Sequence, residues 1–182
     1  MSKVSTAKPK IAGAIYVAPA GTVLPTDATS TIPEAFKPMG FCSDDGMTNT
    51  TDMSATTHKA WGKYVVLVTQ DSKDDGFKFT LIEYANLAVL KHTYGDNNVS
   101  GTLDTGIKIK ASGDELDAHA YIIDLLLADD VIKRICIPEA TVTAIGDIKY
   151  TDSDLIGYET TLACVADDEG GYHYEYIQKK AS

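Results

Sequence analysis

The chain contains 182 residues, with 26 acidic and 16 basic side chains and a formal charge of −10 at pH 7. This length is typical of one domain, and 44% hydrophobic and 23% charged residues are typical of a globular protein. The acidic balance argues against tight binding to nucleic acid or anionic membranes, because both require clustered cations. No apolar run reaches the roughly 18 residues of a membrane span, and residues 1–10 lack the pattern of a signal peptide.

The predicted organisation is a single β-rich domain with short tails. Residues 1–10 are predicted to form a flexible N-terminal arm, residues 11–177 the domain, and residues 178–182 a C-terminal tail. The segment 43–60 has neither a clean hydrophobic period nor a core signal, and we predict a long irregular loop there. This segment leads to Trp61, a residue type favoured at subunit contacts, although Trp61 could equally belong to the core at the start of a strand.

Alternation of apolar and polar residues predicts strands in most of the chain, for example at 77–81 and 172–176. Denser apolar runs at 64–68 and 121–127 predict strands that are covered on both faces, and another subunit could supply the second cover. We expect eight to ten strands, forming a mainly antiparallel β-sandwich or barrel with one flanking α-helix.

Turn and cap residues predict where these elements end. Segments rich in Asp and Gly at 71–76, 127–130 and 167–171 are predicted to be hairpin turns between successive strands. One helix is predicted, with Asn86 as its N-terminal cap and Gly95 just beyond its C-terminal end.

The usual signatures of cofactor or metal binding are missing from the sequence. Glycine-rich phosphate loops are missing, and the four histidines lie far apart without metal-binding spacing. The three cysteines, Cys42, Cys136 and Cys164, are predicted to be reduced and buried. We therefore expect no cofactor, no metal and no enzymatic activity.

Two alternative functions remain open at this point. Asp104-Thr105-Gly106 resembles the active-site loop of homodimeric aspartic proteases, in which two such loops bring two carboxylates together, but the same residues are ordinary hairpin-turn chemistry. Tyr172, Tyr174 and Tyr176 could form an aromatic platform for carbohydrate or host binding, or one face of a core.

Short sequence blocks occur in a fixed order through nearly the whole chain. They include residues 10–19, 21–28, 40–49, 59–62, 79–83, 134–138, 146–148 and 157–161. The set resembles the major tail tube protein of long-tailed, non-contractile bacteriophages. Inner tubes of contractile tails share this fold, so a contractile tail remains an alternative.

The resemblance implies a structural subunit of the virion tail, assembled in the host cytoplasm. Six-fold rings of the chain would stack into a hollow tube around a tape-measure protein, end at tail tip and tail terminator proteins, and conduct DNA during ejection. No membrane anchor is expected. The irregular loop and the terminal arms would connect the rings, with these candidate stacking residues: Asp44, Asp45, Gly46, Thr48, Asn49, Asp52, His58 and Trp61.

Overall fold

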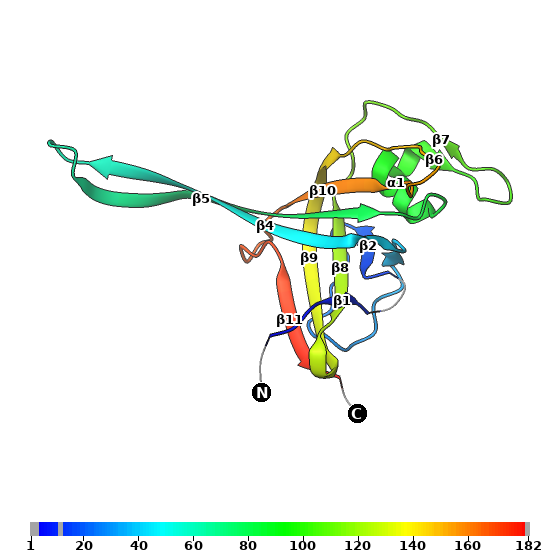
Figure 1. Cartoon of the computed structure of the whole chain (residues 1–182), viewed down its shortest axis with the longest axis horizontal. Coiled ribbons are helices and arrows are strands. Elements are labelled where there is room, and N and C mark those ends of the chain that lie inside the picture. The colour runs from blue at the N-terminus through cyan, green and yellow to red at the C-terminus, as the bar shows by residue number, and fades with distance from the viewer. Residues whose placement is uncertain (1–3, 11–12, 181–182) are drawn as a thin grey trace.

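The computed structural model describes residues 4–10 and 13–180, and most of its strand residues belong to one antiparallel sheet (Figure 1). Its strands follow the order β3-β2-β8-β9-β10-β5-β4, with β1 paired to β8 and β11 paired to β9. The strands are β1 (Lys8–Pro9), β2 (Ile15–Pro19), β3 (Lys37–Pro38), β4 (Cys42–Lys59), β5 (Val65–Leu81), β8 (His119–Leu126), β9 (Val131–Ile145), β10 (Tyr158–Cys164) and β11 (Tyr174–Lys179). The two ends of this order, β3 and β4, do not pair, so the predicted β-sandwich class is confirmed and the sheet is not closed into a barrel.

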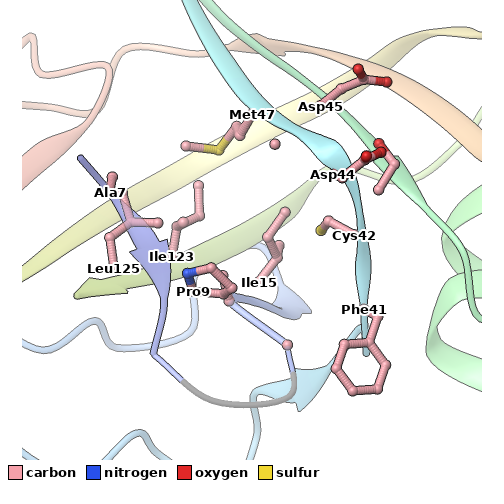
Figure 2. A pocket seen from close by; sticks show the side chains of 14 residues that line it. Ala7, Pro9, Ile15, Phe41, Cys42, Asp44, Asp45, Met47, Ile123 and Leu125 are labelled. Atoms are coloured by element: carbon pink, nitrogen blue, oxygen red, sulfur yellow. The ribbon is translucent and has the colours of Figure 1, made fainter. Parts of the chain in front are cut away.

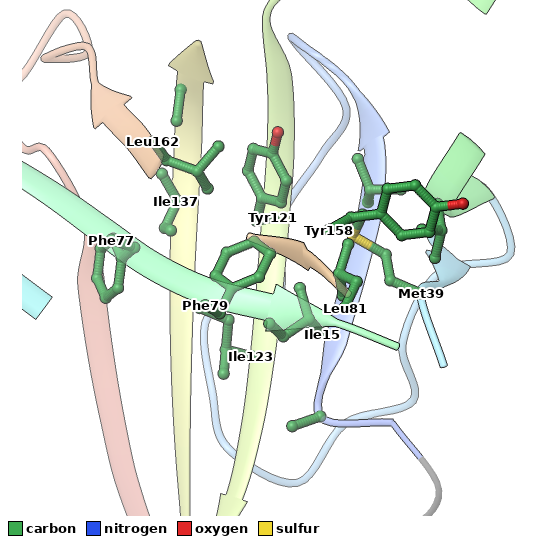
Figure 3. Packing of buried hydrophobic residues seen from close by; sticks show 14 of the residues in the cluster. Ile15, Met39, Phe77, Phe79, Leu81, Tyr121, Ile123, Ile137, Tyr158 and Leu162 are labelled. Atoms are coloured by element: carbon green, nitrogen blue, oxygen red, sulfur yellow. The ribbon is translucent and has the colours of Figure 1, made fainter. Parts of the chain in front are cut away.

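The sheet folds over itself because β9 takes part in two layers. Residues 131–136 of β9 pair with β11 and residues 132–137 pair with β8, whereas residues 140–145 pair with β10. From β10 the sheet continues to β5, which crosses in front of β8 and β9 (Figure 3). The main core fills the space between the layers and includes these buried side chains: Ile15, Phe77, Phe79, Leu81, Tyr121, Ile123, Ile137 and Leu162.

β8 is buried on both faces, as its dense apolar run predicts. Tyr121 and Ile123 face the main core, whereas Ala120 and Ile122 face a second cluster with Phe36. The half-buried Tyr174 and Tyr176 pack against this second cluster, so they line a core rather than form an open aromatic platform.

The helix prediction is confirmed by α1 (Leu87–Tyr94). Asn86 Oδ1 accepts a hydrogen bond from the Ala88 backbone N–H at 2.9 Å, and Gly95 has φ of 97°, in the left-handed region that favours glycine. α1 lies beside the hairpin of β6 (Val99–Ser100) and β7 (Lys108–Ile109) (Figure 1). In the part of the chain that the structure describes, no helix is long and apolar enough to cross a bilayer.

Two predictions about the segment 43–76 are wrong. The segment 43–60 is not an irregular loop, because residues 43–59 lie in β4, and residues 71–76 lie inside β5 instead of forming a turn. Both strands are solvated over most of their length, so no buried face imposed the alternation by which strands are recognised. The predicted turns at 127–130 and 167–171 do connect β8 to β9 and β10 to β11.

The predicted tail boundaries also differ from the structure. β1 pairs with β8, and Lys10 Nζ lies 3.1 Å from Asp124 Oδ2, so residues 8–10 are docked on the domain. β11 extends to Lys179, two residues beyond the predicted domain end. Of the predicted tails, residues 1–3 and 181–182 lie outside the described residues, as do residues 11–12 of the predicted domain.

A buried ion pair joins β8 to β9. Arg134 is fully buried and donates to Asp124 from Nε at 2.6 Å and from Nη2 at 2.9 Å. Its Nη1 donates to the Ser30 carbonyl at 2.9 Å, so the pair also holds the segment that covers β8. The hydrogen bond to Asp124 raises the pKa of Arg134, which keeps the guanidinium charged.

Replacing Arg134 with Met is expected to lower the free energy of unfolding by about 3–5 kcal/mol, because it removes the main partner of a buried carboxylate. The measurement is urea unfolding followed by circular dichroism. Lys133→Met is the matched control, since Lys133 pairs with Glu175 at 2.7 Å in a partly exposed position and should cost under about 1 kcal/mol. Equal losses for the two variants would contradict the structural importance of the buried pair.

His92 makes the stability depend on pH. Its Nε2 lies 2.9 Å from the Tyr121 hydroxyl, and burial, together with repulsion by His119, lowers the pKa of His92 to about 3. The unfolded chain takes up this proton near pH 6.5, whereas the folded chain does not, so stability is lost as pH falls from 6.5 toward 3.

This single group is expected to remove about 1.4 kcal/mol per pH unit in that interval. Unfolding midpoints of wild type and His92→Gln at pH 7 and pH 5 check the prediction, and His92→Gln should lose less stability over this step. His58→Gln, which changes an exposed histidine, should keep the wild-type dependence. A His92→Gln slope equal to that of wild type would refute the assignment.

Candidate assembly surface

A two-stranded arm projects from the folded sheet (Figure 1). We define the arm as residues 51–75, because β5 pairs with β10 only from Gly76 to Leu81 and pairs with β4 alone beyond that point. The strand residues 51–59 span about 30 Å at roughly 3.3 Å per residue. A turn at residues 60–64 closes the arm, with the Ala60 N–H donating to the Tyr64 carbonyl at 2.8 Å.

The outer end of the arm is apolar and exposed. Trp61 is fully exposed, and Tyr64 to Val68 are each 54–76% exposed. We call Trp61 and residues 64–68 the arm tip. The sequence predicts a strand covered on both faces at 64–68, but among the described residues neither face has a cover, because the arm has no second layer. Contiguous apolar surface of this kind marks an interaction site.

Polar side chains bridge the two strands of the arm. Ser54 and Ser72 hydroxyls lie 2.8 Å apart, and Thr56 donates to Asp71 at 2.6 Å. His58 Nε2 lies 3.3 Å from the Thr69 hydroxyl. Because an isolated two-stranded hairpin is only marginally stable, these cross-strand contacts help to keep the arm extended.

A buried carboxylate fixes the base of the arm. Asp75 is 7% exposed and accepts hydrogen bonds from Asn49 Nδ2 at 3.0 Å and Thr51 Oγ1 at 3.1 Å. His173 Nδ1, just before β11, lies 2.6 Å from Asp75 Oδ2. Burial, reinforced by Asp75, raises the pKa of the Cys164 thiol to about 12, so this cysteine stays protonated. Residues of β4 and the segment just before β11 therefore meet at the Asp75 side chain, which belongs to β5.

A groove lies beside the base of the arm, between β4 and the strands β1, β2 and β8 (Figure 2). We call it the base groove. Its volume is about 360 Å³, and burial raises the pKa of its Cys42 thiol to about 11. Its large apolar lining residues are Pro9, Ile15, Phe41, Met47, Ile123 and Leu125. Asp44 and Asp45 also line the groove, and both are exposed.

The eight predicted stacking residues do not form one cluster. Asp44, Asp45 and Gly46 lie in a bulged part of β4 at the base groove, and Thr48 and Asn49 follow. The remaining three, Asp52, His58 and Trp61, are spread along the arm to its turn. The predicted stacking residues did not include residues 64–68 or Asp75. The apolar run that follows Trp61 was the sequence signal for residues 64–68.

The possible catalytic loop is an exposed turn. Asp104 lies between β6 and β7, and hydrogen bonds between Thr102 and Thr105 close that turn. This arrangement corresponds to the hairpin-turn interpretation of Asp104-Thr105-Gly106. Across residues 4–10 and 13–180, no three His, Cys, Asp or Glu side chains are grouped to hold a metal ion.

A family model described as phage tail tube protein matches residues 8–182. The match covers nearly the whole chain, so the chain belongs to the phage tail tube protein family and is a structural component of a phage tail. The resemblance seen in the sequence is thereby confirmed. No curated protein matched the chain.

Replacing Asp75 with Asn is expected to loosen the base of the arm, because an amide cannot accept all of the hydrogen bonds that the carboxylate accepts. The loss should be about 1–3 kcal/mol in the local opening free energy. Hydrogen exchange of the arm amides should accelerate, while the β8 and β9 amides stay protected. Asp74→Asn, an exposed neighbour, serves as the control, and unchanged arm exchange in Asp75→Asn would argue against the contact.

Proposed function

We propose that this phage tail tube protein forms six-fold rings that stack into a hollow tube, and that the arm makes the contacts between subunits. The observation that carries the proposal is the apolar arm tip, which no part of the described chain covers. Solvated apolar surface of this extent is costly in a lone subunit and becomes favourable when another subunit buries it.

Open sheet edges also support association between copies. β4 pairs on one side only, with β5, so the other edge of its 18 residues has no strand beside it in the described chain. Exposed edges of this length favour pairing with another strand, and closed rings remove such edges. A ring of identical subunits in which these edges meet would have a continuous inner wall of strands.

The hollow tube would surround the tape-measure protein during assembly in the host cytoplasm, with tail tip and tail terminator proteins at its ends. After the tape-measure protein leaves, DNA would pass through the tube into the host. The formal charge of −10 supports this role, since net repulsion from phosphate disfavours the retention of DNA on the wall.

The test is electron microscopy of the purified protein, which should show rings or hollow tubes as concentration rises. In the matched variant, Asn-Gly replaces residues 54–72, which shortens the arm and closes it with a two-residue turn. We expect this variant to stay folded and monomeric, because the core residues of β5 are untouched.

An exposed apolar residue away from the arm supplies the control. Leu155 is 74% exposed, and Leu155→Ser should assemble like wild type. Normal tubes from the shortened variant would show that the arm is dispensable, and the absence of rings and tubes from wild type at every concentration would count against the proposed function itself.

A further inference from the structure

We propose that the arm tip of one copy docks into the base groove of a second copy of this chain. The inference rests on the proposed function and adds the surface that receives the arm. It also assigns a direct role in assembly to residues at both ends of β4.

The arm cannot reach the base groove of its own chain. Met47, at the groove, and Lys59, beside the turn, are separated by twelve residues of β4, or about 40 Å of extended strand. Cross-strand hydrogen bonds run along the arm, so folding it back would break them. An arm that fills this groove must therefore come from another copy.

The two surfaces match in polarity and size. The groove has an apolar floor from β2 and β8, where Ile15 and Ile123 are buried, and the half-exposed Phe41 lies at its edge (Figure 2). The tip presents the fully exposed Trp61 and the 76% exposed Tyr64. Aromatic side chains of this kind are the usual anchors of protein interfaces, and a groove of about 360 Å³ has room for such a ring.

Charges around the two surfaces are opposite in sign. Lys59 and Lys63 flank Trp61 at the turn, and both are exposed. Asp44 and Asp45 stand at the base groove, where β4 bulges away from β5 between Cys42 and Met47. Lysines around an apolar anchor and carboxylates around an apolar groove give the contact a defined partner and orientation.

The contact uses two different surfaces of the same molecule. Each copy offers an arm tip and a base groove, so every copy can donate to one neighbour and receive from another. Head-to-tail contacts of this kind repeat until a ring closes or a filament grows. An isolated copy would keep both surfaces exposed, and an assembled copy would bury both.

A charge exchange tests this pairing. The tip variant combines Lys59→Asp with Lys63→Asp, and the groove variant combines Asp44→Lys with Asp45→Lys. Either variant alone should raise the protein concentration needed for tube formation by about tenfold or more, because it places like charges together. The chain that carries all four substitutions should assemble within about threefold of the wild-type concentration. Tube formation is measured by sedimentation and microscopy, and circular dichroism confirms that each variant is folded.

A crosslink supplies a second readout that does not depend on the charge variants. In one chain, Lys63→Cys places a thiol at the tip and Asp45→Cys places an exposed thiol at the groove. A short bismaleimide should join these two cysteines between copies in assembled tubes, as identified by peptide mapping. In the control chain, Leu155→Cys, which is exposed outside both surfaces, replaces Lys63→Cys and should not be joined to the groove thiol.

The outcomes separate this inference from the proposed function. If wild type forms tubes, but the four-substitution chain fails to recover or the tip thiol maps to another surface, the base groove is not the receiving site and the tube assignment stands. If wild type forms no rings or tubes, both proposals fall together. Recovery of assembly, together with a crosslink between the tip thiol and the groove thiol, would establish the pairing.

Discussion

A two-stranded β-ribbon has no second layer to cover its faces. This constraint separates the molecule into a packed domain and an exposed arm. In the domain, β8 is dry on both faces because β5 and β10 cover one side and the segment around Phe36 covers the other. In the arm, the equally apolar residues 64–68 are exposed on both faces. The described chain therefore contains a part whose apolar side chains are covered and a part whose apolar side chains are left exposed.

One strand connects these two parts. β5 contributes Phe77, Phe79 and Leu81 to the main core and then continues outward as half of the arm (Figure 3). At the junction, a Cβ on Gly76 would lie 2.7 Å from the Leu162 carbonyl oxygen, so glycine permits the close approach of β10. Asp75 binds β4 at the same level. The direction of the arm is thus set by the packed sheet.

The buried polar groups of the domain are used for structure. Arg134 and Asp124 hold β8, β9 and the covering segment together, and His92 is kept neutral beside Tyr121. Asp104, the residue that suggested catalysis, is exposed in a turn at the edge of the molecule. These features suit a building block of a tail tube, in which the surfaces that matter are those that meet other copies.

The sequence was sufficient for the helix, for strands with one buried face and for the family. Asn86 and Gly95 delimited the helix through capping, alternation identified strands with one buried face, and the ordered blocks indicated the tail tube family. It failed for β4, because a strand with two solvated faces has no hydrophobic period. It also placed the turn at 71–76, where Asp and Gly are abundant, although the chain turns beside Trp61.

Only the tertiary structure could reveal the base groove. Its lining comes from residues as far apart in sequence as Pro9, Phe41 and Ile123, which pairing within the folded sheet brings together. The sequence shows that the arm tip is apolar, but it does not show that these side chains are exposed. The same apolar run can be buried in one fold and exposed in another. Whether it is buried depends on which strands pack against it in the tertiary structure.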